Sequence, residues 1–313
     1  MDARDFGNTL GMGSVTVADD QLPPSAPPAA TATAGGRCYQ DIVFAQTIGY
    51  RPLLMDLHVP ERDEAAPVIM CIYGGGFAMG SHKTDRPGAY LTRRLVAEGF
   101  AVARPQYRHS REARFPAQVH DVKAAVRWLR HHAADVGIDP GRIAAWGSSS
   151  GGYLATMLAV TGGTARLEGT VGLVGPSSAI QAAVAWSAPV NITRLPPPPA
   201  ESPFHRLGAD PHDWLLAGRA EDHPELATEA TTSTHVSLGS SPLILVHGDA
   251  DTAIPIEQPE EMVSAYERAG AVVDFAPIPG ADHVFDDATR EAQATAGISF
   301  LLNYLAGAEG PKN

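Results

Sequence analysis

Residues 142–152 read RIAAWGSSSGG, and this stretch decides the fold. A short apolar run ends at Trp146, the pattern Gly-x-Ser-x-Gly occupies 147–151, and the helix-forming run GYLATML follows at 152–158. This order predicts a strand, a sharp turn centred on Ser149 and a helix. The flanking glycines leave room for the strained backbone that such a turn requires. The N–H groups at the start of the helix then face any negative charge that forms beside Ser149, as in a nucleophile elbow.

Strand and helix signals alternate along the chain from about residue 39 onward. The first two predicted strands form an antiparallel pair, and the continuous apolar run at 67–73 is typical of a strand buried on both faces. The eight predicted strands are 41–45, 53–59, 67–73, 100–104, 142–146, 182–186, 242–247 and 272–278. Helices are predicted at 89–98, 116–132 and 257–269, behind Ser149 and near the C-terminus. The alternation indicates an α/β protein: a mostly parallel, doubly wound sheet with helices on both faces and sites along one edge.

Two segments depart from this alternation. Residues 1–36 contain four prolines among Ala, Thr and Ser, which predicts an extended or disordered N-terminal arm. Residues 191–240 contain a run of four prolines and a weakly helical stretch around Trp214, and they fall between two predicted strands. Because long loops at this edge are usually functional, we expect a small cap over the site rather than an inert insertion. Residues 37–313, including this cap, are expected to form one domain.

The composition excludes several classes of protein. The chain has 313 residues and a net charge of −12, which argues against nucleic acid or an anionic membrane as a partner. Its two cysteines, Cys38 and Cys71, are too few for a disulfide framework, and no zinc-binding spacing occurs. The first residues lack the apolar core of a secretory signal, and no run approaches about 18 apolar residues. We therefore expect a cytoplasmic protein without a membrane span.

A glycine triplet, GGG at 74–76, follows the predicted strand at 67–73. Consecutive glycines let the backbone approach a ligand closely and turn its N–H groups toward it. Acyl transfer needs such donors because the carbonyl oxygen gains negative charge, and losing one donor costs about 3–4 kcal/mol. A glycine-rich β-turn is the alternative. The position between a buried strand and the elbow favours an oxyanion hole made by the N–H groups of Gly75, Gly76 and Ser150.

An acid follows the elbow along the chain, at the end of the strand predicted at 242–247. The loop begins with HGDAD at 247–251. A carboxylate in this place can hold an imidazole in one tautomer and stabilise its protonated form. Asp251 lies further into the loop and can reach across, whereas Asp249 is expected to cap the turn by local hydrogen bonding. His247 still belongs to the strand end and is expected to be structural.

A base follows the next strand, in GADHVF at 280–285. As neutral imidazole, His283 can accept the proton of Ser149 and return it to the leaving group. A five-residue serine pattern or a single loop histidine means little alone, since both arise often by chance. The order Ser149, Asp251, His283, each after a successive strand end, is the order that α/β-hydrolases use.

These motifs resemble the α/β-hydrolase superfamily, and within it the hormone-sensitive-lipase-like and bacterial feruloyl-esterase-like carboxylesterases. The similar stretches lie across most of residues 40–307 and include YGGGFAMG, FPAQVHDVKAAVRWLRHHAADVGIDPGRIAAWGSSSGGYLA, SPLILVHGDADTAIP and GADHVF. The resemblance implies an eight-stranded sheet whose first pair is antiparallel. It also implies Ser149 as nucleophile, Asp251 and His283 as its partners, and the loop of Gly75 and Gly76 as oxyanion hole.

The chain departs from the family pattern beside the predicted nucleophile and its loop. The family usually has His where this chain has Tyr73, a side chain that braces the oxyanion loop. It commonly has an acidic residue before the nucleophile and Ala after it, whereas this chain has Ser148 and Ser150. These departures affect the geometry of the hole and the charge beside the nucleophile, but they delete no catalytic group.

We therefore expect a serine hydrolase that cleaves small-molecule carboxylic esters of small to medium acyl chains through an acyl-enzyme intermediate, without metal or organic cofactor. The same triad suits amide, formamide or lactone hydrolysis, because the cap selects the acyl group. A C–O lyase and a non-hydrolytic small-molecule receptor are further alternatives, the receptor being less expected because all three triad residues are present. The sequence leaves the oligomeric state open, and a homodimer through edge strands is the assembly to check.

Overall fold

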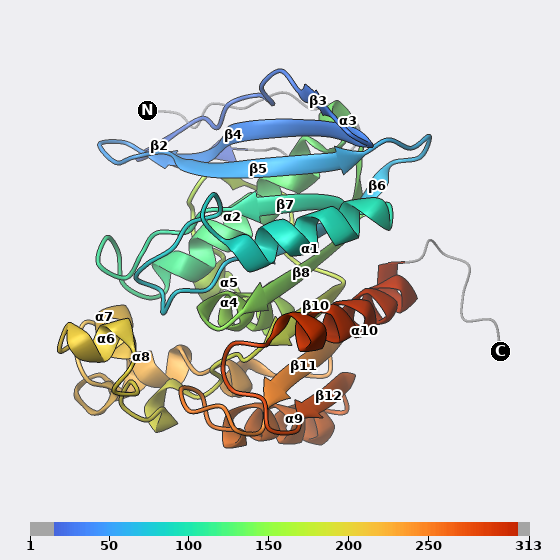
Figure 1. Ribbon diagram of the computed structural model, residues 1–313. Coiled ribbons are helices and arrows are strands. Elements are labelled where there is room, and N and C mark those ends of the chain that lie inside the picture. The colour runs from blue at the N-terminus through green and yellow to red at the C-terminus, as the bar shows by residue number, and fades with distance from the viewer. Residues whose placement is uncertain (1–15, 306–313) are drawn as a thin grey trace.

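The computed structural model describes residues 16–305 (Figure 1). Its centre is a sheet whose eight main strands follow the order β12-β11-β10-β8-β6-β7-β5-β4. Their bounds are β4 Gly36–Thr47, β5 Leu53–Pro60, β6 Ala66–Ile72, β7 Ala101–Pro105, β8 Ile138–Ser148, β10 Ala182–Trp186, β11 Leu243–Gly248 and β12 Val273–Ile278. Strand β5 is antiparallel to both of its neighbours, and the pairs from β7 across to β12 are parallel. The eight predicted strands and the antiparallel first pair are confirmed.

Alternate side chains of β6 enter two separate cores, as the two-residue period of a strand requires. Met70 packs with helices α2, α4 and α9 on one face of the sheet, whereas Ile69 and Cys71 pack with α1 and α10 on the other. Figure 1 shows α1 and α10 in front of the sheet and α2 behind it. The helices are α1 Arg86–Ala97, α2 Ala117–His131, α3 Ala133–Val136, α4 Ser150–Val160, α5 Ala165–Glu168, α9 Glu257–Ala269 and α10 Asp287–Leu305. Between residues 16 and 305, no helix is both long and apolar enough to cross a membrane.

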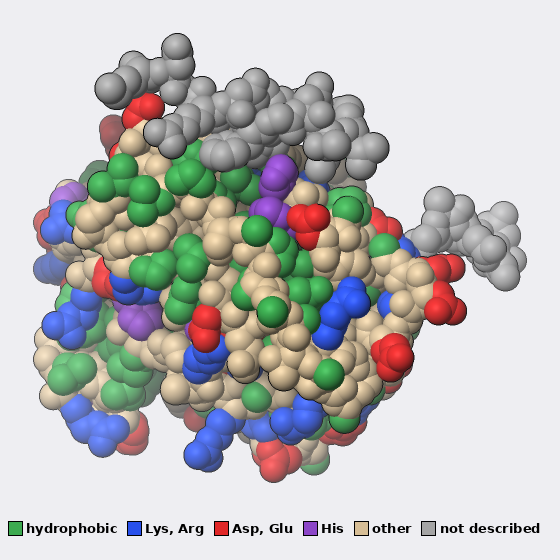
Figure 2. Space-filling model, turned by 90° about the horizontal axis from the view of Figure 1, so that it is seen from above, with side chains coloured by type: hydrophobic (Ala, Val, Ile, Leu, Met, Phe, Trp, Pro, Cys, Tyr) green, Lys and Arg blue, Asp and Glu red, His purple; other side chains and the backbone are tan. Residues whose placement is uncertain are grey.

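Residues 16–36, the described part of the predicted arm, lie along the body of the protein. Strand β1 (Thr16–Val17) pairs with β9 (Leu173–Val174), and β2 (Gln21–Leu22) and β3 (Thr31–Thr33) pair with β4. The last two widen the sheet to ten strands. This part of the arm is therefore extended, one of the two predicted alternatives, and it is paired with the body of the protein rather than disordered. Residues 1–15 lie outside the described residues. On the described part of this end of the molecule, acidic and basic side chains are interspersed (Figure 2).

The insertion at 191–240, here called the cap segment, lies beyond the carboxyl ends of the strands (Figure 1). Its short helices are η1 Ile192–Arg194, α6 Pro203–Arg206, α7 Pro211–Leu216, η2 Ala220–Asp222, α8 Pro224–Glu229 and η3 Thr232–His235. Both ends of the cap segment are fastened to α9, because the side chains of Asn191 and Ser233 donate hydrogen bonds to Glu261 at 2.9 and 2.7 Å. The Tyr153 hydroxyl of α4 also donates to the carbonyl oxygen of Ala230 at 2.6 Å.

Candidate active site

Ser149 stands at the turn between β8 and α4, with backbone angles φ 55° and ψ −126°. A Cβ atom on Gly147 would lie 2.1 Å from the carbonyl oxygen of Gly151, and one on Gly151 would lie 2.1 Å from that of Ile72. Side chains at these two positions would therefore push the turn apart. The Ser149 N–H donates to the carbonyl oxygen of Trp186 at 2.8 Å, which fastens the turn to β10. The strand, sharp turn and helix predicted around Ser149 are present.

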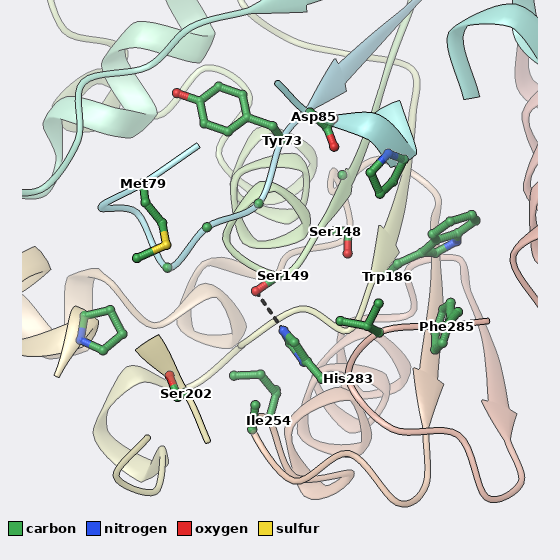
Figure 3. A pocket seen from close by; sticks show the side chains of 18 of the residues that line it. Tyr73, Met79, Asp85, Ser148, Ser149, Trp186, Ser202, Ile254, His283 and Phe285 are labelled. Carbon is green, nitrogen blue, oxygen red and sulfur yellow. Dashed lines mark hydrogen bonds between the residues drawn. The ribbon is translucent and has the colours of Figure 1, made fainter. Parts of the chain in front are cut away.

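The structure brings Ser149, Asp251 and His283 together at the carboxyl ends of the strands. Figure 3 shows the hydrogen bond between Ser149 and His283. His283 Nε2 lies 3.0 Å from Ser149 Oγ, and its Nδ1 lies 2.8 Å from Asp251 Oδ2. A carboxylate can only accept, so Nδ1 carries the proton and the Nε2 lone pair faces the serine hydroxyl. This tautomer is the one in which a histidine can remove the hydroxyl proton.

The carboxylate of Asp251 is enclosed and well supplied with donors. Its Oδ1 accepts hydrogen bonds from the backbone N–H groups of Ala253 and Ile254 at 2.9 and 2.8 Å. Burial alone would raise its pKa, but hydrogen bonds from His247 and His283 hold the pKa of the Asp251 carboxyl well below its ordinary value. Asp251 is therefore ionised beside His283 at neutral pH, as stabilisation of an imidazolium requires.

Asp249 and His247, the other two candidate residues of HGDAD, make different hydrogen bonds. Asp249 Oδ1 accepts the N–H of Gly280 at 2.7 Å, so it joins two loops of the site. The predicted local cap is wrong, because the Asp249 carboxylate accepts no hydrogen bond from its own turn in the described chain. His247 is buried, and its Nε2 lies 2.8 Å from the carbonyl oxygen of Ile254 and 3.3 Å from Asp251 Oδ2. The sequence interpretation treated His247 as structural and missed this contact with Asp251. The four-residue spacing of His and Asp in HGDAD is the signal that could have revealed it.

The glycine loop after β6 lies directly against the elbow. A Cβ atom on Gly74 would lie 2.7 Å from the carbonyl oxygen of Ser148 and 3.3 Å from Ser149 Cβ. Gly75 and Gly76 have positive φ angles of 134° and 57°, which glycine adopts without strain. Within the described chain, the N–H groups of these two glycines have no hydrogen-bond acceptor. They are therefore free to bind an oxygen atom beside Ser149, together with the N–H of Ser150 at the first position of α4.

A pair of stacked tyrosines supports this loop from behind. The rings of Tyr73 and Tyr107 are 4.4 Å apart and inclined by 14°. The Tyr107 hydroxyl donates to the carbonyl oxygen of Tyr73 at 3.2 Å and lies 3.4 Å from Ser150 Oγ. Burial raises the pKa of both phenols, so both hydroxyls stay protonated. Tyr107 thus touches the residue before the glycine loop and the residue after Ser149, a link that sequence inspection did not find.

A cavity of about 630 Å³ opens beside Ser149 and His283. In Figure 3, Ser148, Trp186 and Phe285 lie on one side of Ser149, and Met79 and Ser202 lie on the other. The cap segment contributes much of the second side; its lining residues are Pro196, Pro198, Pro199, Glu201, Ser202, Pro203, Phe204, Pro211 and His212. None of the described arm residues lines this cavity. The space beside Ser149 is therefore large enough for a small organic molecule and mostly apolar on the cap side.

Polar groups are few in the cavity and have separate roles. Burial raises the pKa of Asp85, whose carboxyl lies before α1 and lines the cavity. Arg290 also lines it, but its guanidinium is held by Asp287 and by the carbonyl oxygen of Phe285, both at 2.6 Å. Ser148 adds an uncharged hydroxyl where the resembling family commonly has an acid.

One group of ligand-type side chains lies away from this cavity. Single ligand atoms of Asp41, Asp56 and His82 all lie within 4.8 Å of one another. Lys83 Nζ stands beside them, 2.7 Å from Asp56 and 3.1 Å from Asp41. The ammonium already supplies the positive charge that the carboxylates require, so this group does not fit a metal ion.

The sequence of this chain is similar to those of curated esterases. Esterase LipQ of Mycobacterium tuberculosis is 29% identical over 246 residues, which are 77% of this chain and 56% of that protein. The probable carboxylic ester hydrolase LipM of the same organism is 28% identical over 281 residues, 85% of this chain and 62% of that protein. The chain thus spans somewhat more than half the length of these curated relatives.

A solved structure with a similar fold is also that of an esterase. A truncated carbohydrate esterase from gut microbiota superimposes with a TM-score of 0.73 and 27% identity, covering 88% of this chain and 99% of the other. The fold is therefore the α/β-hydrolase fold that the sequence motifs predicted. The BD-FAE family model matches residues 55–266, which is more than half of the chain and includes the elbow and Asp251. This protein belongs to the BD-FAE family of α/β-hydrolases.

Proposed function

We propose that this protein is a serine hydrolase that cleaves carboxylic esters of small to medium acyl chains. The observation that carries the proposal is the hydrogen-bonded series Ser149–His283–Asp251, whose Ser149 and His283 line the 630 Å³ cavity. A nucleophile, a base with its lone pair on the nucleophile and an ionised acid behind the base are the three groups that acyl transfer to serine needs. The esterase names of the relatives support the same reaction.

In this mechanism Ser149 Oγ attacks the ester carbonyl carbon while His283 Nε2 takes the hydroxyl proton. Asp251 stabilises the imidazolium, and the N–H groups of Gly75, Gly76 and Ser150 bind the oxygen that becomes negative. The Oγ–C bond forms, the bond to the alcohol oxygen breaks, and His283 gives its proton to the leaving alcohol. Water then attacks the acyl carbon and gives a proton to His283. The bond between that carbon and Ser149 Oγ breaks, His283 returns the proton to Oγ, and the acid leaves. Each oxyanion donor is worth about 3–4 kcal/mol in such a site.

The lining of the cavity supports a limited acyl length. The proline rings and Phe204 of the cap segment form an apolar wall, and Phe204 lies so close to Gly76 that a Cβ there would meet its ring at 2.4 Å. This contact places the cap segment next to the loop that would bind the carbonyl oxygen. A short or medium acyl chain fits beneath such a wall, whereas a long chain would have to extend past it.

Acylated sugars are a second substrate class. The solved neighbour described as a carbohydrate esterase suggests it. The observation in this chain that favours it is the pair of polar groups on the α1 side of the cavity, the Asp85 carboxyl and the Ser148 hydroxyl. A carboxylate and a hydroxyl can bind sugar hydroxyl groups, which simple alkyl alcohols lack.

The test is hydrolysis of p-nitrophenyl esters from acetyl to dodecanoyl, with the wild type beside Ser149→Ala. Turnover that peaks at one chain length and disappears in the variant supports the proposal and measures the acyl pocket. If the folded wild type hydrolyses no ester of the series and no acetylated sugar, the proposal is wrong. Amides, lactones and β-elimination substrates would then be assayed next.

A cytoplasmic location and a homodimer are likewise proposals. Strand β12 is the last strand of the sheet at its end, with one described neighbour, β11. An unpaired strand edge of this kind can join a second copy. Cell fractionation tests the location, and sedimentation equilibrium tests the dimer.

A further inference from the structure

A second cavity of about 520 Å³ lies between the turn that follows β7 and helix α7 of the cap segment. The turn contributes Ser110, Arg111 and Arg114, and the cap segment contributes Asp213 and Trp214. This cavity shares no lining residue with the cavity beside Ser149. It is therefore a separate space that joins the body of the protein to the cap segment.

The two arginines of this cavity are not neutralised within residues 16–305. Neither Arg111 nor Arg114 makes an ion pair or a side-chain hydrogen bond there, and both are exposed. The acids nearest in the chain are engaged elsewhere, because Glu112 accepts hydrogen bonds from Arg51 at 2.6 and 2.8 Å and Asp121 is held by Arg108 at 2.7 Å. Two guanidinium groups without an acidic partner therefore lie three residues apart on one wall of the cavity.

Other groups of the cavity suit an anion as well. The guanidinium carbon of Arg111 lies 5.5 Å from the centre of the Trp214 ring, which keeps the side chain in place before any ligand binds. Ser110 is 5% exposed, and its buried hydroxyl has no hydrogen-bond partner in the described chain. A buried polar group without a partner destabilises the protein, and a bound oxygen atom would supply the missing partner.

One acidic residue, Asp213, also lines this cavity. Burial raises its pKa, and the nearby carboxylate of Asp210 raises it further. Arg219 and His212 lower it in part, and Asp213 forms no ion pair with Arg111 or Arg114 among residues 16–305. Asp213 therefore leaves the charge of Arg111 and Arg114 available.

We propose that Ser110, Arg111, Arg114 and Trp214 form a binding site for a small oxyanion, a carboxylate or a phosphate group. A planar guanidinium can donate two parallel hydrogen bonds to either group. The source is a free metabolite anion or an acidic group on a larger ligand, and the two share this chemistry. The site does not depend on the proposed ester hydrolysis.

The site is connected to the glycine loop by direct contacts. The Ser110 N–H donates to the carbonyl oxygen of Phe77, the residue after Gly76, at 2.8 Å. On the cap side, Trp214 packs edge-on against Phe204, with ring centres 6.1 Å apart. Phe204 in turn covers Gly76. An anion that bridges the turn and Trp214 thus holds the two segments that flank the loop.

The test is calorimetric titration of the full-length protein with inorganic phosphate, acetate and benzyl phosphate at constant ionic strength, with chloride as the balancing anion. We expect saturable binding of at least one of the three probes. A preference for phosphate over acetate assigns the site to phosphate groups, and the reverse assigns it to carboxylates. Tighter binding of benzyl phosphate than of phosphate indicates that the anion belongs to a larger ligand.

Three variants separate this site from general attraction of anions. Arg111→Gln with Arg114→Gln should weaken binding at least tenfold, and Ser110→Ala should weaken it several-fold. The matched control, Arg93→Gln on the exposed side of α1, should bind as the wild type does. Equal binding by the double variant and the wild type overturns the proposal, as does the absence of saturable binding by all three probes. Because the readout is heat of binding, either result is independent of ester turnover.

Discussion

Replacing Tyr107 by phenylalanine removes one hydroxyl group that touches both sides of the proposed oxyanion hole. Its bonds to the carbonyl oxygen of Tyr73 and to Ser150 Oγ measure 3.2 and 3.4 Å. Hydroxyl bonds in proteins are most often about 2.7–2.8 Å, so the direct loss is at the low end of about 0.5–1.5 kcal/mol. The carbonyl and hydroxyl left without a partner in a buried place add about 1–3 kcal/mol. We therefore expect Tyr107→Phe to lower the free energy of unfolding by about 2 kcal/mol.

The same variant should lower kcat more than it changes KM. The proposed donors bind the oxygen most strongly when it is negative, so a small displacement of the loop acts mainly on the transition state. If the displacement costs about a third of one donor, kcat falls about tenfold. The assay is steady-state hydrolysis of p-nitrophenyl acetate, with Tyr50→Phe at an exposed tyrosine as the matched control.

A double-mutant cycle with Ser150→Ala decides whether the hydroxyl acts through Ser150. The contact predicts a coupling energy of about 0.5–1 kcal/mol in kcat, so the double variant should lose less than the sum of the single losses. The reasoning is refuted if Tyr107→Phe is less stable but keeps a kcat within about twofold of the wild type. It is also refuted if the losses of the two single variants simply add.

Three other predictions follow from the geometry of the site. Asp251→Asn should lower kcat about 10³–10⁴-fold in the same assay, because an amide no longer fixes the tautomer of His283. Since folding lowers the pKa of Asp251 below its unfolded value of about 3.9, its ionised form stabilises the protein above that pH and this stability is lost as the pH falls. Urea unfolding between pH 6 and pH 2 should therefore show a shallower acid loss for Asp251→Asn; an unchanged slope would contradict the assignment. Gly76→Ala should reduce kcat at least tenfold because its Cβ would meet the Phe204 ring at 2.4 Å, and Phe204→Ala in the same chain should restore part of the activity.

The strands could be predicted from the sequence because the sheet imposes a simple requirement on each of them. A strand covered on both faces must be apolar throughout, and every residue of β6 is buried. The elbow could also be predicted, because Gly147 and Gly151 stand two positions either side of Ser149. The structure leaves no room for a side chain at either position. The order of Asp251 and His283 followed from the rule that loops after parallel strands share one edge.

The secondary structure and contacts of the arm and the cap segment could not be predicted from such patterns. Strands β2 and β3 have only two and three residues, and their pairing with β4 depends on the edge that β4 offers rather than on a period of their own. The short helices of the cap segment give no long amphipathic pattern. What holds its ends is Glu261, a residue of α9 that lies outside the insertion, so the local sequence of the insertion carries no sign of it.

Two of the residues that depart from the family pattern, Tyr73 and Ser150, are connected in the structure. From the sequence, Tyr73 in place of His bears on the geometry of the oxyanion hole, whereas Ser150 in place of Ala carries no such implication. Tyr107 contacts both, since its ring stacks on Tyr73 and its hydroxyl lies beside Ser150 Oγ. A buried serine hydroxyl needs a partner that alanine would not need, and a buried tyrosine ring fills space that histidine would leave. Tyr107 therefore connects the two positions, and a change at either one should act on the oxyanion loop through Tyr107.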